Sequence, residues 1–192
     1  MNADHERELL SRTARDPTAF EDIYDHYLPR IYAYVGVRVA QKQDVEDLVA
    51  ETFVKALAGI ESFVWQHEAS FAAWLFRICH NLVCNFYRQS QHQKTHLSLD
   101  TVLYLHNGMD SPEVALVQKE HISQVWEWLH LLPRRQQEIL MLKLFGELRN
   151  KEIAIVLGLD ERTVAAHLCR GIKEIHRKYT EEFNRVLDGG TL

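Results

Sequence analysis

The residues best suited to chemistry lie in one stretch, FAAWLFRICHNLVCNFYR, at residues 71–88. Asn81 lies one helical turn after Arg77, and Arg88 lies two turns after Asn81, with Tyr87 next to Arg88. This stretch contains no acidic residue, although acids outnumber bases in the whole chain. Arginines neutralise phosphate, an aromatic ring stacks on a base, and an amide pairs with a base edge. The pattern indicates a nucleic-acid surface; the alternative is a core helix with a solvated basic side.

The opposite face of this stretch predicts that the helix packs on a core. Apolar residues recur there at helical spacing. They are Phe71, Trp74, Leu75, Ile78, Leu82 and Phe86. Phe76 falls with Tyr87 on the flank of the polar face, so we expect both rings beside the cations.

Metal-binding and catalytic sites are the competing interpretations of this stretch. Cys79, His80 and Cys84, with His167 or Cys169 further along, are residue types that bind metals, but their spacing matches no structural zinc signature. Cys84 lies one helical turn after His80, as a nucleophile and its base would. No glycine-rich phosphate loop or nucleophile elbow accompanies the pair. We therefore predict no metal, no cofactor and no enzymatic activity.

Composition narrows the class of protein. The 192 residues are 46% hydrophobic, which is enough for folded cores in one or two domains. No apolar run is long enough to cross a bilayer, and the N-terminus is no signal peptide. An odd number of cysteines, three, favours a reducing cytoplasm. Because the net charge is −5, nucleic-acid binding must use local patches, which leaves acidic surface for a basic partner.

Three helices are expected before this stretch. A short one spans about Glu6–Ala14, and the next starts at Asp16, with Pro17 in its first turn. Pro29 predicts a kink or restart in the second. The third is capped by Asp44 and runs to about residue 57. Its exposed side carries Glu46, Asp47, Ala50, Glu51 and Lys55.

The composition changes after residue 88, and the chain is expected to divide there. Residues 89–111 are rich in Gln, His and Ser and contain an Asn-Gly pair, which is typical of a mobile linker. We predict an all-α protein with two small helical domains, at residues 1–88 and 112–180. Residues 181–192 are expected to form a tail.

The second domain is expected to contain a helix-turn-helix. A helix starts at Pro112 and stops before Pro133, and another covers Arg134–Phe145. Helices at Asn150–Leu157 and Asp160–Tyr179 are then joined by a tight turn with Gly158. The last one is basic, with five Lys or Arg against three acids from residue 160 to 178. No strand signal is found.

Five blocks, in their order and separation, resemble the extracytoplasmic-function (ECF) class of bacterial sigma factors. They are Phe20–Tyr24 with Tyr27, Asp44–Leu57, Phe71–Arg88, Leu131–Leu140, and Lys151 to Arg170. The resemblance implies that the first domain binds the beta-prime clamp of RNA polymerase core and melts the promoter at its minus-ten element. The second would bind the minus-thirty-five element and the beta flap. It also implies an anti-sigma factor as inhibitor.

The resemblance assigns expected roles to individual residues. Those expected to bind core polymerase are Asp47, Ala50, Glu51 and Lys55. Those expected at minus-ten DNA are Trp65, Arg77, Asn81, Tyr87 and Arg88. Those expected at minus-thirty-five DNA are Lys143, Asn150, Lys151, Arg162, Ala166, His167, Arg170 and Lys173.

This chain also departs from the family pattern. Ala50 stands where many relatives carry Gln, which removes one polar clamp contact. Arg149 replaces a usual capping Ser, so either Asn150 caps or the helix begins less sharply. The recognition helix reads TVAAH from Thr163, with methyl groups at positions that could reach DNA, and Gly171 costs about 1 kcal/mol of helix propensity. The alternatives are a stand-alone helix-turn-helix regulator with an N-terminal sensor domain and a sigma-like decoy.

Overall fold

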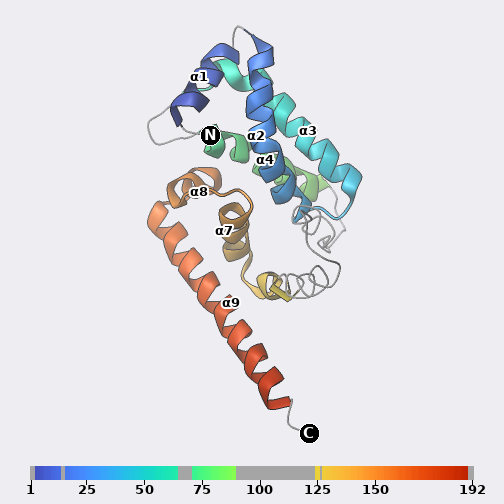
Figure 1. The fold of residues 1–192 in the computed structure, drawn as a ribbon, viewed down its shortest axis with the longest axis vertical. Coiled ribbons are helices and arrows are strands. Elements are labelled where there is room, and N and C mark those ends of the chain that lie inside the picture. The colour runs from blue at the N-terminus through green and yellow to red at the C-terminus, as the bar shows by residue number, and fades with distance from the viewer. Residues whose placement is uncertain (1–2, 14–15, 65–70, 90–123, 126, 190–192) are drawn as a thin grey trace.

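The computed structural model describes residues 3–13, 16–64, 71–89, 124–125 and 127–189, and within them every regular element is helical (Figure 1). An N-terminal region holds α1 (Ala3–Thr13), α2 (Phe20–Gly36), α3 (Lys42–Gly59) and α4 (Phe71–Gln89), with 3-10 turns at Pro17–Ala19 and Ile60–Ser62. A C-terminal region holds helical residues at 124–125 and 127–131, then α7 (Arg134–Leu144), α8 (Asn150–Leu157) and α9 (Glu161–Gly189). The predicted all-α class is confirmed. The predicted linker and the helix start at Pro112 lie outside the described residues.

The start of α2 differs from the prediction. Asp16 caps the 3-10 turn and not the α-helix: its Oδ1 accepts hydrogen bonds from the Thr18 amide at 3.0 Å and the Thr18 hydroxyl at 2.7 Å. The residue before α2 is Ala19, which makes no side-chain cap. A 3-10 turn is a common lead into an α-helix, because its tighter bonding satisfies amides that would otherwise lack partners.

Pro29 does not end α2, so the restart is wrong, while the alternative of a kink stays a prediction. The helix continues from Phe20 to Gly36 with the proline inside it. Proline removes one amide and leaves the carbonyl four residues earlier, that of Asp25, without its partner. Asp25 and Pro29 are both exposed, so water can satisfy that carbonyl, and the buried stripe on the other side holds the helix together.

The start of α3 also differs. The helix begins at Lys42, and Gln41 is its extended cap residue, so Asp44 lies inside the first turn. There the carboxylate complements the helix dipole without capping. The helix ends at Gly59, close to the predicted end at about residue 57, and its buried residues include Val45, Val49 and Phe53.

The C-terminal region confirms the predicted helix-turn-helix. Gly158 ends α8 in the left-handed conformation, at φ 64°. Asp160 caps α9: its Oδ1 accepts the Thr163 amide at 2.8 Å and its Oδ2 accepts the Thr163 hydroxyl at 2.5 Å. At the start of α8, Glu152 accepts the Arg149 amide at 2.7 Å. Of the two alternatives for this helix start, a cap by Asn150 is wrong, because Arg149 is the cap residue and Asn150 is the first residue of the helix.

The last helix, α9, is longer than expected, reaching Gly189 and not Tyr179. Figure 1 shows its C-terminal half projecting beyond the rest of the molecule. Gly171 has a packing reason, since a Cβ there would lie 2.8 Å from Leu140 Cδ1. The glycine therefore lets α9 approach α7 closely, in return for its lower helix propensity.

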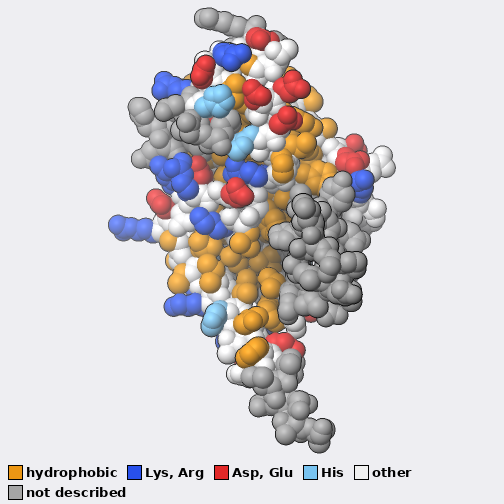
Figure 2. All heavy atoms as spheres, viewed as in Figure 1, with side chains coloured by type: hydrophobic (Ala, Val, Ile, Leu, Met, Phe, Trp, Pro, Cys, Tyr) orange, Lys and Arg blue, Asp and Glu red, His pale blue; other side chains and the backbone are white. Residues whose placement is uncertain are grey.

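The two regions pack against each other. α8 lies on α4, and one hydrophobic cluster runs from the N-terminal region through Phe76 to Leu148 and Ile153 of the C-terminal region. In the view of Figure 2, charged side chains of both signs cover the N-terminal region and hydrophobic ones gather over the C-terminal region. Across the described part of the chain, no helix combines the length and apolarity needed to cross a membrane.

Candidate nucleic-acid and polymerase interface

The polar face of α4 is open to solvent as predicted. Arg77, Asn81 and Arg88 are exposed, while Tyr87 is half-buried with its ring 5.7 Å from that of Phe86 in a T-shaped contact. Nη2 of Arg88 donates to Oδ1 of Asn85 at 2.5 Å. The apolar stripe of α4 packs on α2 and α3, which turns these polar groups outward. Two cations and an amide are thus presented along one side of one helix.

Phe76 is not available for stacking, and its expected place beside the cations is wrong. The ring is fully buried, 5.7 Å from Tyr34 in an edge contact and against the loop that precedes α8. Helical spacing placed it on the flank, and packing of the C-terminal region on that flank covers it. Trp65 lies outside the described residues, so its expected role at the minus-ten strand stays a prediction.

The outer side of α3 carries the residues expected to contact core polymerase. Asp47, Ala50, Glu51 and Lys55 are all exposed. Lys55 Nζ lies 3.3 Å from Glu51 Oε1, and the similar pair Lys42–Glu46 spans 3.5 Å. Such exposed pairs one turn apart contribute only ~0.3–0.5 kcal/mol, so a basic partner could replace them at little cost.

A shallow apolar pocket adjoins Ala50, between α2 and α3. Its volume is about 390 Å³, and it is lined by Tyr24, Leu28, Pro29, Tyr32, Glu46, Val49 and Ala50. The short side chain of Ala50 leaves this pocket beside the acidic groups. The side of α3 that was expected to act through charge therefore also offers an apolar recess.

The expected minus-thirty-five residues divide by exposure. Arg162, Arg170 and Lys173 on α9 are exposed. Half-buried members of the set are Asn150, Lys151, Ala166 and His167. Lys143 lies on α7, and its Nζ donates to the Leu148 carbonyl at 3.1 Å. That bond ties Lys143 to the loop before α8, apart from the two helices of the helix-turn-helix.

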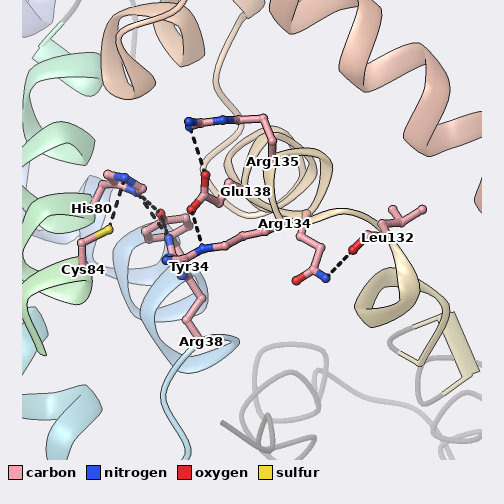
Figure 3. Close-up of polar contacts among 9 residues, drawn as sticks. Tyr34, Arg38, His80, Cys84, Leu132, Arg134, Arg135 and Glu138 are labelled. Carbon is pink, nitrogen blue, oxygen red and sulfur yellow. Dashed lines mark hydrogen bonds and ion pairs between the residues drawn. The ribbon is translucent and has the colours of Figure 1, made fainter. Parts of the chain in front are cut away.

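A buried polar cluster joins α2 and α4 behind the exposed face (Figure 3). His80 Nδ1 lies 3.0 Å from the Tyr34 hydroxyl and 3.4 Å from Arg38 Nη1, and Arg38 also donates to Tyr34. Because arginine only donates, Nδ1 is the acceptor and Nε2 carries the proton in the neutral ring. Burial, followed by the charge of Arg38, lowers the pKa of His80 to about 4.

This cluster does not support a cysteine nucleophile. Cys84 Sγ lies 3.4 Å from His80 Nε2, but that nitrogen is the protonated one and cannot take the thiol proton. Cys79 is fully buried, and burial raises its thiol pKa to about 12. Within the described residues, no group of three His, Cys, Asp or Glu side chains could hold a metal ion.

Sequence reasoning missed two arginines, Arg30 on α2 and Arg38 two residues beyond its end. They lie three residues after Tyr27 and four residues after Tyr34, respectively. Each guanidinium lies over the ring of the preceding tyrosine, at 5.0 Å for Arg30 and 5.2 Å for Arg38. The repeated Tyr-x(2–3)-Arg spacing on an apolar face was the available signal for two cation–π contacts.

The fold and the site define a two-region helical protein with a helix-turn-helix, and the comparisons narrow the class. The family model for Sigma-70 region 2 matches residues 23–93, and that for Sigma-70, region 4 matches residues 122–175. The chain is 32% identical over 164 residues to RNA polymerase sigma factor YlaC of Bacillus subtilis, covering 85% of this chain and 93% of that protein. It is 30% identical over 171 residues to ECF RNA polymerase sigma factor BldN of Streptomyces coelicolor, covering 88% of this chain but 64% of that protein's length.

This chain therefore belongs to the ECF class of the sigma-70 family. Its fold is similar to that of CnrH in complex with the cytosolic domain of CnrY, with a TM-score of 0.64 at 21% identity over 97% of this chain and 99% of that chain. The sigma factor RpoE of Bartonella quintana, in complex with the anti-sigma factor NepR, gives 0.58 at 19% identity over 82% and 94%. At these identities the two structures support the fold.

Proposed function

We propose that this protein acts in the cytoplasm as a promoter-specific initiation factor of RNA polymerase, without enzymatic activity of its own. The observation that carries the proposal is the exposed polar face of α4, with Arg77, Asn81 and Arg88 on one side of a helix whose other side is core. Within the family, this face belongs to the domain matched by Sigma-70 region 2.

We assign the minus-ten strand to α4. The two arginines would hold phosphates on either side of Asn81, whose amide has both a donor and acceptor for a base edge. The strand must be separated to expose that edge, and extruding a base costs a few kcal/mol, which stacking and hydrogen bonds at the site must recover. Tyr87, half-buried beside Arg88, offers one ring for stacking.

The minus-thirty-five element is assigned to α9. Arg170 is the exposed side chain suited to a guanine edge, and Arg162 and Lys173 are suited to phosphates. Ala166 offers only a methyl group and His167 is half-buried, so upstream readout rests on few contacts. We expect this region to bind duplex DNA weakly without the rest of the polymerase.

Core polymerase is assigned to the outer side of α3, where Asp47 and Glu51 face a basic clamp. Apolar side chains exposed on the C-terminal region, such as Leu131 and Leu144, suit the beta flap. An anti-sigma factor is proposed as the inhibitor, since one structural neighbour was solved with such a protein. The domain division at residues 1–88 and 112–180, with its linker, is proposed on the same family basis.

Binding to purified core polymerase tests this function. Glu51→Lys should weaken binding at least several-fold while leaving the helical content unchanged, because it reverses an exposed charge on α3. Glu21→Lys is the matched control, an exposed carboxylate in the first turn of α2. A stand-alone DNA-binding regulator would not bind core at all. Core binding that is equal for parent and Glu51→Lys would move the docking surface elsewhere.

A further inference from the structure

A second asparagine lies on the polar face of α4, one turn after Asn81. It completes a line of exposed side chains at spacings of four, four and three residues: Arg77, Asn81, Asn85 and Arg88. Residues three and four apart on a helix are neighbours on one face. Asn85 was not among the residues expected at minus-ten DNA, so the face assigned to the strand contains an amide without a role.

Arg88 determines which way the Asn85 amide is turned. Arg88 Nη2 lies 2.5 Å from Asn85 Oδ1 and donates to it. The two ends of an amide are alike in shape, so its orientation follows from the hydrogen bonds that it makes. Since a guanidinium only donates, the amide atom beside Arg88 is the oxygen. The amide nitrogen, with its two N–H donors, is the part of Asn85 that remains for another partner.

The Asn85–Arg88 pair therefore presents N–H donors to a partner. Arg88 uses one lone pair of the amide oxygen, and the other lies next to a positive charge, which disfavours the partly positive hydrogen of a second donor. The guanidinium keeps further N–H groups that can hold a phosphate. Both side chains are exposed, so a DNA strand can reach them. A base edge that contacts the pair has to supply acceptors.

The edges of the four bases differ in this respect. Guanine presents two neighbouring acceptors, N7 and O6, whereas adenine presents N7 beside its N6 amino donor. Cytosine presents its N4 amino donor, and thymine presents one acceptor, O4. An asparagine that can use both ends of its amide pairs with adenine, but an asparagine whose oxygen is held by an arginine lacks the acceptor for N6. Guanine is therefore the base that suits the pair best.

We propose that Asn85 is a further specificity-determining residue, which together with Arg88 selects guanine and rejects adenine at one position of the melted minus-ten strand. The inference rests on the proposed function. Asn85 lies four residues after Asn81, or about 6 Å along the helix axis. A stacked strand advances ~3.4 Å per nucleotide. The selected base should therefore lie within two nucleotides of the one that Asn81 reads.

The test is transcription by core polymerase with the full-length protein, on promoters that carry randomised minus-ten bases and a transcribed barcode. The base preference at each position is then a ratio that does not depend on total output. The variant Asn81→Ala marks the position that Asn81 reads. Within two nucleotides of it, the parent should prefer guanine to adenine by about 5–10-fold. Asn85→Ala should bring this ratio close to one and leave the other positions as they are.

Two substitutions separate base selection from a merely structural pair. Asn85→Asp keeps the shape and the contact with Arg88 but replaces the N–H donors by an acceptor, so the preference should move to cytosine, whose N4 amino group donates. Arg88→Met releases the amide oxygen of Asn85, so adenine should become the preferred base, although total output falls with the lost phosphate contact. Gln89→Ala, an exposed amide on the same helix, is the matched control and should change no preference.

The contradicting results differ between the two levels of the proposal. A guanine preference that persists in Asn85→Ala would overturn the inference alone. So would Asn85→Asp and Arg88→Met variants that lose output while the preferred base stays the same. Transcription that never depends on this protein would reject the proposed function, and this inference with it. Circular dichroism should show the same helical content in all variants, because the substituted side chains are exposed.

Discussion

At the residue scale, Asn81 is the most informative side chain on the proposed DNA surface. It is exposed one turn after Arg77 on a helix held by its apolar side. Asn81→Ala should slow open-complex formation and flatten the preference at one minus-ten position, since the amide that pairs with a base edge is lost. Binding to core should be unchanged, because α3 is not altered.

Permanganate footprinting on duplex and premelted promoters measures this effect. Gln89→Ala is the control, an exposed amide at the C-terminal end of the same helix. Equal reactivity for parent and Asn81→Ala on the duplex promoter, together with unchanged base preference, would leave only phosphate contacts for α4.

Arg170 and Lys173 separate base readout from phosphate contacts. Arg170→Ala should relax the preference at one upstream position by ~1–3 kcal/mol if the guanidinium pairs with guanine, whereas Lys173→Ala should weaken all upstream sequences alike. Promoter output measured over a permuted upstream element distinguishes the two. Two alanine variants with the same uniform loss would place Arg170 among the phosphate contacts.

His80 predicts a pH dependence of stability. Its pKa is lowered from 6.5 to about 4 by burial and by Arg38, so the unfolded chain binds the proton more readily. Between pH 6.5 and 4, the free energy of unfolding should fall as the pH falls, by on the order of 1–3 kcal/mol in total. Above pH 6.5 and below pH 4, His80 makes no contribution to the change of the free energy of unfolding with pH.

The measurement is urea unfolding of the parent and of His80→Gln across this pH range. Glutamine keeps an acceptor for Tyr34 and Arg38 but does not titrate. Burial raises the pKa of Glu6, which gives a slope of opposite sign, and that contribution cancels in the difference between the two proteins. A difference that does not change with pH would show that His80 is protonated alike in both states.

At the element scale, the turn between α8 and α9 depends on Gly158. Its φ is +64°, and a Cβ there would meet no atom within 4 Å. Gly158→Ala should therefore destabilise the protein by about 1 kcal/mol through backbone strain alone, with Gly158→Asn losing less because asparagine tolerates this conformation. Thermal unfolding of the three proteins checks the order. An alanine variant as stable as the parent would contradict the strain.

Local sequence signals predicted those helices whose ends are marked by characteristic residue types. Gly158 and Asp160 marked the turn between α8 and α9, and the acid-free stretch marked α4 to within one residue. The start of α3 at Lys42 was missed, because its cap residue, Gln41, makes no side-chain hydrogen bond to the helix. The extra turns of α9 were missed because polar residues after Tyr179 support a solvated helix as readily as a coil.

At the scale of the whole molecule, sequence periodicity identified which faces are buried but not which partner covers them. Phe76 was placed on a polar flank because its cover comes from Gly146 and Leu148, some 70 residues further along the chain. The bond of Arg30 to the Gly146 carbonyl was missed for the same reason, since its acceptor belongs to the other region. Long-range packing of this kind leaves no local pattern to detect.

The most direct measurement of the central claim is transcription from genomic fragments by core polymerase, with and without this protein, followed by mapping of the transcript 5′ ends. The account predicts new start sites that share one sequence near minus ten and another near minus thirty-five. Glu51→Lys should reduce all of them together, and Asn81→Ala should redistribute them. If core polymerase with the protein gives the same 5′ ends as core alone, this chain does not direct initiation.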